Sequence, residues 1–292
     1  MYTQMILGAI AGLSLFLYGM QLMGDGLQKV AGEGLKGIIR RLTKNRLMSV
    51  LVGMFVTTII QSSSATTVMV VGFVNAGLMT LAQAVGVVFG ANIGTTITGQ
   101  MVSFNLSQWA PLVIAAGLVA NMLTKNPKVK EASEIFIGFG ILFIGMSTLS
   151  NSLEPLKELP EFTNWILQYG SNPFVGVGIG LLMTFVLQSS SATIGILIAL
   201  ASQGVLPITT AIFIIFGDNI GTCTTALISS LGTSRRGKQV ALFHLMINII
   251  GTIYFMLFLR GILVNVVESI DPGNVARQIA NAHTIFNIVN VI

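Results

Sequence analysis

The sequence predicts an all-α polytopic membrane protein made of two inverted repeats, each with a re-entrant helical hairpin and a broken transmembrane helix. Three observations predict this class: an apolar composition, an internal repeat at a constant offset, and loop charges that differ between the two halves. Of the 292 residues, 53% are hydrophobic and only 9% are charged, whereas about a quarter of the residues in a soluble domain are charged. Because one span needs roughly 20 apolar residues, we expect roughly seven to ten membrane elements.

The charged residues and the single cysteine exclude several other classes of protein. The 15 Lys and Arg exceed the 10 Asp and Glu, but in a membrane protein this surplus reports loop orientation and lipid contact. We therefore expect membrane lipids as partners and no nucleic acid. Cys223 is the only cysteine and cannot form an internal disulfide. No G-x-S-x-G, P-loop or metal-ligand cluster occurs, so we expect neither an enzyme nor an organic cofactor.

An internal repeat in the sequence supports the prediction that the chain consists of two related halves. Residues 53–98 align without a gap on residues 180–225, at the constant offset of 127 that separates Gly53 from Gly180. The identities gather in two polar strings: QSSSAT at 61–66 recurs at 188–193, and F-G-x-N-I-G-T at 89–95 recurs at 216–222. Shared hydrophobicity would match apolar residues instead, so we infer a duplication.

Loop charges indicate that the two halves are inverted. Lys and Arg crowd residues 29–46, 125–130 and 235–238, which the positive-inside rule places in the cytoplasm. Residues 151–172 carry three Glu and one Lys, so they belong outside, although their counterpart in the first half is the basic segment. Equivalent loops thus fall on opposite sides. Inverted repeats bind their substrate at the interface between the halves.

These observations define the expected boundaries. The first repeat covers residues 1–123, with a hairpin at about 47–79 and a broken helix at about 80–100. A cytoplasmic link follows at 124–134. The second repeat covers 135–259, with a hairpin at about 173–206 and a broken helix at about 207–230. Residues 260–292 are an external loop and the start of a further transmembrane helix.

The QSSSAT strings are the first candidate site. Each lies between two apolar arms that are too short to cross a membrane alone, which predicts a hairpin whose tip leaves helical geometry where protein or water satisfies the backbone. The amide and hydroxyl groups offer oxygens to a hard cation such as sodium, and hydroxyl donors to an anion. Hydroxyls that only pack helices together are the alternative, but two identical strings disfavour it.

The second repeated string, 90–98 and 217–225, places glycines around Asn and Thr inside apolar sequence and predicts a helix break. A break would expose N–H groups to an anion and carbonyls to sodium; the alternative is a glycine kink without a ligand. Asp218 is the one acid in these segments, and its counterpart is Ala91. It binds sodium or a proton, or caps the half-helix. His244 and His283 each precede an Asn by four residues, which predicts interhelical hydrogen bonds.

The duplicated QSSS motifs, each followed by G-x-N-I-G-T, resemble those of the type II sodium/phosphate cotransporter family, and the resemblance covers nearly the whole chain. It implies sodium-driven symport of inorganic phosphate in a multi-pass protein of the cell membrane, the inner membrane in a bacterium. A homodimer is left open. The resemblance implies that Gln61–Ser64 and Gln188–Ser191 form the site, with Asn92, Thr95, Asn219 and Thr222 as neighbours, whereas Asp218 departs from the family pattern, in which a small residue is expected. Together with the chemistry of the side chains, this gives the candidate ligands. Phosphate ligands would be Ser62, Ser63, Ser64, Ser189, Ser190, Ser191, Asn92 and Asn219, and Na⁺ ligands would be Gln61, Gln188, Thr66, Thr193, Thr95, Thr222 and Asp218.

Two alternative functions remain at this stage. Hydroxyl clusters do not distinguish tetrahedral anions, so a sodium-coupled transporter of sulfate or arsenate would use the same residues. A passive anion channel would share the polar lining but would conduct without a sodium gradient. For the transporter we expect alternating access.

Overall fold

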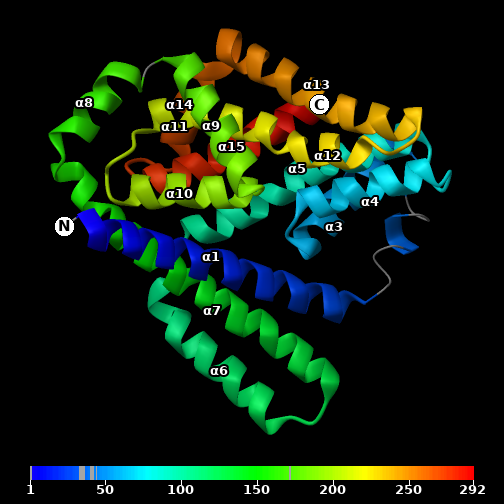
Figure 1. Cartoon of the computed structure of the whole chain (residues 1–292), viewed down its shortest axis with the longest axis horizontal. Helices are drawn as coiled ribbons and strands as arrows, with labels where there is room; N and C mark the ends of the chain where they lie inside the picture. Colours follow the sequence, from blue (N-terminus) through cyan, green and yellow to red (C-terminus); the bar gives the residue numbers. More distant parts are fainter. Residues whose placement is uncertain (1, 33–36, 40–42, 44, 171) are drawn as a thin grey trace.

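The computed structural model describes residues 2–32, 37–39, 43, 45–170 and 172–292, and within them the chain forms helices and no strand (Figure 1). In order, the elements are α1 (Tyr2–Ala31), α3 (Arg46–Ile60), α4 (Ser63–Asn75), α5 (Leu81–Ser103), η1 (Ser107–Trp109), α6 (Ala110–Leu123), α7 (Pro127–Leu153), η2 (Glu154–Glu158), α8 (Pro160–Tyr169), α9 (Pro173–Leu187), α10 (Ser190–Ser202), α11 (Ile208–Gly221), α12 (Cys223–Ser230), α13 (Arg235–Tyr254), the π-helical turn η3 (Phe255–Leu259), α14 (Arg260–Ile270) and α15 (Val275–Val291).

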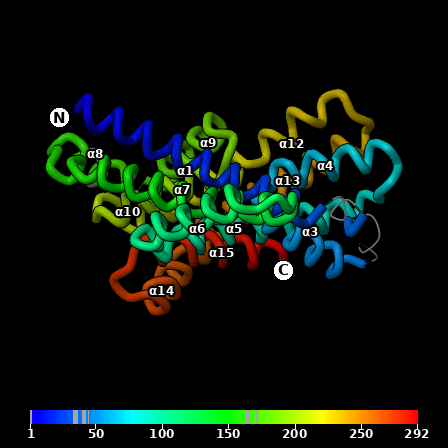
Figure 2. Tube along the Cα trace, turned by 90° about the horizontal axis from the view of Figure 1, so that it is seen from below, coloured from blue at the N-terminus to red at the C-terminus, as the bar shows by residue number. Residues whose placement is uncertain are grey.

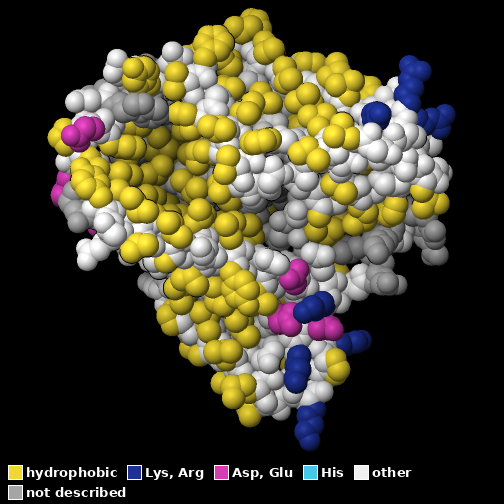
Figure 3. Space-filling view, viewed as in Figure 1, with side chains coloured by type: hydrophobic (Ala, Val, Ile, Leu, Met, Phe, Trp, Pro, Cys, Tyr) yellow, Lys and Arg dark blue, Asp and Glu magenta, His cyan; other side chains and the backbone are white. Residues whose placement is uncertain are grey.

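The outer surface confirms a multi-pass membrane protein. Five helical stretches of the described chain are long and apolar enough to cross a bilayer: Tyr2–Ala31, Leu81–Ser103, Pro127–Glu158, Ile208–Ser230 and Arg235–Ile270. Large apolar side chains such as Leu7 and Ile250 are exposed on their outer faces, as lipid contact requires. Figure 3 shows apolar atoms over most of one face, with Lys and Arg gathered on the right and lower side, over the α6–α7 and α12–α13 turns.

Helices α1 and α7 pack against each other in opposite directions. A methyl group on Gly12 would collide with α7 near Gly145, and one on Gly19 would collide near Gly138, so positions that rise along α1 meet positions that fall along α7. The glycines allow the two backbones to approach closely. Since Gly138 and Gly145 follow Gly12 and Gly19 by the same 126 residues, equivalent helices of the two halves run antiparallel. Figure 1 shows α1, α7 and α6 as a layer beneath the remaining helices.

Each half contains a hairpin followed by a helix parallel to its first arm. A methyl group on Gly90 of α5 would meet the backbone of α3 at Val50, and one on Gly94 would meet it at Met54, so α3 and α5 run parallel. The hydroxyls of Thr57 and Thr66 lie 2.9 Å apart, which requires α4 to fold back beside α3. The equivalent contacts, Gly217 with Val177 and Gly221 with Leu181, hold α11 against α9 in the same way. Figure 2 shows the elongated molecule, with α8 at one end and α4 at the other.

Three expected boundaries are wrong. The first predicted helix break does not exist, because α5 is continuous from Leu81 to Ser103 and its glycines serve close packing on α3. In the second half only Thr222 separates α11 from α12; it keeps helical dihedral angles, and its N–H donates to the Asp218 carbonyl at 3.0 Å.

The other two corrections concern the ends of the repeats. Most of the predicted link is helix, because α7 begins at Pro127 with its N-terminus capped by the Asn126 side chain. Residues 260–270 are also helical instead of a loop, since α14 continues α13 through the π-helical turn.

Candidate functional site

The two QSSS motifs form the turns at which the hairpins reverse direction. Gln61 and Gln188 end the first arms in the left-handed region, with φ of 58° and 52°. The next residues, Ser62 and Ser189, begin the second arms as N-caps: their hydroxyls accept hydrogen bonds from the N–H groups of Ala65 and Ala192 at 3.1 and 3.2 Å. Each tip therefore presents a helix C-terminus and a helix N-terminus side by side.

These helix ends give each tip its electrostatic character. The first N–H groups of a helix lack intrahelical partners and carry positive partial charge, whereas the last carbonyls carry negative partial charge. A tip can thus attract an anion to the start of α4 or α10 and a cation to the end of α3 or α9. We predicted exposed helix ends at the G-x-N-I-G-T strings, and the structure has them at the QSSS tips instead.

The two tips line one shared cavity of about 30 Å³. Its nine lining residues are uncharged and polar: Gln61, Ser62, Ser63, Ser64, Thr95, Gln188, Ser189, Ser190 and Ser191. A water molecule takes about 30 Å³ in the liquid, so in this conformation the cavity fits one water-sized particle, such as a dehydrated Na⁺. Phosphate has five heavy atoms and would require the tips to separate.

Threonines of the following helix hold both glutamines in place. Thr98 donates to the Gln61 side-chain oxygen at 2.7 Å, and its counterpart Thr225 donates to Gln188 at 2.9 Å. Each glutamine amide in turn donates to a carbonyl of its own first arm, Thr58 or Phe185. Each side-chain oxygen keeps a second lone pair for a ligand.

The two repeats meet through long hydroxyl contacts at the tips. Thr95 of the first half lies 3.5 Å from Ser190 of the second, and Ser64 lies 3.5 Å from Thr225. These distances exceed the 2.5–3.0 Å of a well-formed O–H···O bond. The contacts between the tips are therefore weak enough to separate.

Several predicted ligands do not line this cavity. The Asn92 side-chain oxygen accepts a hydrogen bond from His244 Nε2 at 2.9 Å, which confirms an interhelical bond for this histidine. Asn219 donates to the Ile215 carbonyl of its own helix. Thr66 pairs with Thr57, and Thr193 pairs likewise with Thr184 at 2.9 Å. Thr222 is buried outside the lining.

Asp218 also lies behind the tips. It is fully buried, and within the described residues its carboxylate accepts one hydrogen bond, from Thr184 at 2.6 Å. No backbone N–H of the described chain caps it, so the capping alternative is excluded. His283 Nε2 approaches the other carboxylate oxygen to 3.9 Å, beyond hydrogen-bond distance. The expected hydrogen bond of His283 is thus absent among the described residues.

The sequence interpretation missed the residues that position the tips. Thr98, Thr225, Thr57 and Thr184 were not chosen as site residues. A signal was present, because Thr57 and Thr98 both recur as Thr at the offset of 127. Identical polar residues in two duplicated halves mark positions where each half needs the same hydrogen bond.

Comparison with known proteins identifies the family. The Na+/Pi-cotransporter family matches the chain twice, over residues 15–151 and 147–270. YqeW of Bacillus subtilis is 29% identical over 95% of this chain and 89% of its own length. The putative inorganic phosphate export protein YjbB of Salmonella typhimurium is 22% identical over 98% of this chain, which spans about half (52%) of that relative.

A eukaryotic relative is similar over a smaller share of the chain. The rat sodium-dependent phosphate transport protein 2A is 23% identical over 82% of this chain and 58% of the rat protein. No solved structure matches the chain.

Proposed function

The chain belongs to the Na+/Pi-cotransporter family, and we propose that it is a sodium-coupled phosphate symporter that works by alternating access between two inverted repeats. One observation carries this proposal: the tips of both hairpins, far apart in sequence, line one uncharged polar cavity. The antiparallel packing of α1 and α7 supports the inverted relation of the repeats.

The proposal assigns roles to the cavity residues. The six tip serines, Ser62–Ser64 and Ser189–Ser191, donate hydroxyl hydrogens to phosphate oxygens beside two helix N-termini. Gln61, Gln188 and Thr95 supply oxygens to Na⁺. In this proposal the residues behind the tips position the ligands: Asn92, Asn219, Thr66, Thr193, Thr222 and Asp218.

Charge gives the reason for coupling. Among the described residues no Lys or Arg lines the cavity, so phosphate must be neutralised by helix dipoles, hydroxyl donors and a co-bound cation. A sodium ion bound at the same tips lowers the cost of burying the anion, and phosphate in turn raises the affinity for sodium.

The test is uptake of labelled phosphate into proteoliposomes under an inward sodium gradient, with potassium replacing sodium as control. We expect uptake with sodium only. Equal uptake with both cations would reject symport and favour a passive channel. Excess sulfate or arsenate as competitor tests the anion: loss of phosphate uptake would show a wider oxyanion specificity.

Direction needs its own measurement, because the YjbB relatives are named for export. Vesicles preloaded with labelled phosphate, under outward and inward sodium gradients, distinguish the two directions. A symporter follows the sodium gradient in either direction, whereas an exporter independent of sodium releases phosphate at the same rate in both.

A further inference from the structure

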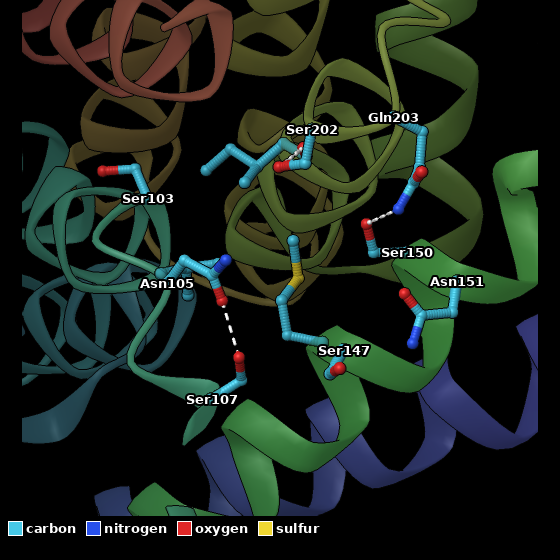
Figure 4. A pocket seen from close by; sticks show the side chains of 11 residues that line it. Ser103, Asn105, Ser107, Ser147, Ser150, Asn151, Ser202 and Gln203 are labelled. Atoms are coloured by element: carbon cyan, nitrogen blue, oxygen red, sulfur yellow. Dashed lines mark hydrogen bonds between the residues drawn. The ribbon is translucent and has the colours of Figure 1, made fainter. Parts of the chain in front are cut away.

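A second polar cavity, of about 150 Å³, lies at the end of the molecule that carries η2 and the α5–η1 turn (Figure 4). Eight uncharged polar residues line it: Ser103, Asn105, Ser107, Ser147, Ser150, Asn151, Ser202 and Gln203. Figure 4 shows Asn105 on one wall and Ser150, Asn151 and Gln203 on the other. The loop charges place this end outside the cell.

The same helix connects this outer cavity to the hairpin tips. Ser190 at the start of α10 lines the central cavity, and Ser202 at its end lines the outer one. Since α10 has 13 residues, the two cavities lie about 20 Å apart. A ligand in the outer cavity would stand at the outer end of the hairpin that has to move.

The local electrostatics favour a cation. The C-terminal ends of α5, α7 and α10 all reach the cavity, at Ser103, Asn151 and Ser202, and helix C-termini carry negative partial charge. The nearby cation, Arg277, donates to Ser103 at 2.9 Å, but Asp271 lies 3.6 Å from its guanidinium and offsets its charge. Hydroxyl and amide oxygens are ligands that a hard cation accepts.

The equivalent residues at the opposite end of the molecule contact each other directly. At the offset of 127, Ser234 corresponds to Ser107 and Asn75 to Ser202. Ser107 and Ser202 both line the outer cavity, whereas the N–H of Ser234 donates directly to the Asn75 side chain at 2.8 Å. Equivalent residues of the two halves therefore line a cavity at one end of the molecule and bond to each other at the other end.

We infer that the outer cavity is a loading site for a partly hydrated sodium ion, which rests on the proposed sodium symport. Its volume equals the share of about five water molecules in the liquid, enough for the ion with part of its hydration shell. The central cavity, at about 30 Å³, accepts the ion only after it sheds these waters.

Transport kinetics test the loading site. The double variant Ser147→Ala/Asn151→Ala removes two oxygen ligands without filling the cavity. We expect about a fivefold rise in the sodium concentration for half-maximal uptake, as expected for about one lost polar interaction, with the maximal rate unchanged. Thr148→Val is the matched control, because Thr148 is the neighbour of Ser147 on α7 and its hydroxyl bonds to the Ile144 carbonyl. An unchanged sodium dependence in the double variant would overturn the inference.

A binding measurement separates this inference from the proposed function. Trp109 lies two residues from Ser107 and is 55% exposed, so Trp165→Phe leaves it as the sole tryptophan and a reporter of the outer cavity. Without phosphate, sodium should change the fluorescence emission of Trp109. The change should persist in Ser63→Ala/Ser190→Ala, and it should be lost in the double variant at Ser147 and Asn151. If uptake proves independent of sodium while this response remains, symport fails and the loading site stands. A response to phosphate alone would overturn the cation assignment.

Discussion

The two hairpins share their tips but differ one layer behind them. In both, a glutamine oxygen accepts from a threonine of the next helix, and two threonines pair at 2.9 Å below the turn. Behind this layer the first repeat has fully buried Ala91, and the second has fully buried Asp218.

Different covering helices hold the two repeats. His244 of α13 bonds to Asn92 in the first half, whereas His283 of α15 faces Asp218 in the second. The residues at the hairpin tips are therefore the same in both halves. The residues that face α13 in the first half and α15 in the second have diverged. In the proposed mechanism the substrate contacts only the tips, so a duplicated site can tolerate such divergence.

The largest expected effect is the loss of stability when a carboxylate is placed in the first repeat. We expect Ala91→Asp to lower stability by about 3 kcal/mol or more, because a buried carboxyl there would lack a facing histidine. Asp218→Ala should cost less than about 1 kcal/mol, because it converts the second segment into the first. Thermal unfolding in detergent measures both. If Asp218→Ala instead raised stability by as much as Ala91→Asp lowers it, the two environments would be equivalent and the comparison would be wrong.

Removing tip hydroxyls should have the next largest effect. Ser63→Ala and Ser190→Ala each remove a donor to a charged ligand, worth about 1.5 kcal/mol, so each should lower phosphate uptake about tenfold and the double variant about 100-fold. Ser229→Ala is the control, since that hydroxyl bonds to the Ala226 carbonyl of its own helix. Wild-type uptake in both single variants would remove the serines from the site.

The hydrogen bonds that hold the two glutamines, from Thr98 to Gln61 and from Thr225 to Gln188, should differ in strength. Thr98 is 1% exposed, whereas Thr225 is only half-buried, so water can replace the lost bond more readily at Thr225. We expect Thr98→Val to raise the phosphate concentration for half-maximal uptake about fivefold, and Thr225→Val by less. Thr224→Val, which removes a hydrogen bond from α12 to the Gly221 carbonyl at the end of α11, is the reference. A larger effect at Thr225 would contradict the burial argument.

The smallest expected effect comes from breaking the hydrogen bond between Asn75 and Ser234. Asn75→Ala removes the acceptor of the Ser234 N–H, a bond worth about 1 kcal/mol. Hydrogen exchange of the α12–α13 turn should therefore accelerate about fivefold, while the α5–η1 turn at the outer cavity stays unchanged. Unchanged exchange at Ser234 would show that other contacts close this end.

Much of the fold was predictable from local patterns. The short apolar arms around QSSSAT predicted interrupted helices, and α3 and α9 do end at Gln61 and Gln188. The glycine strings led to a wrong prediction of a helix break in α5, because a glycine inside an apolar segment can either break a helix or allow a neighbouring backbone to approach. In α5 the neighbour α3 takes that space, which a local reading of the sequence does not reveal.

The sequence alone determined the membrane class, the duplication and the polar motifs, because composition and repeated residues are properties of the chain itself. The tertiary structure decided which polar residues share a cavity. Asn92 and Thr95 are three residues apart on α5, yet Thr95 faces the tips and Asn92 faces His244. The reason is physical: helical spacing fixes the direction of a side chain, but only packing determines which helix covers each turn.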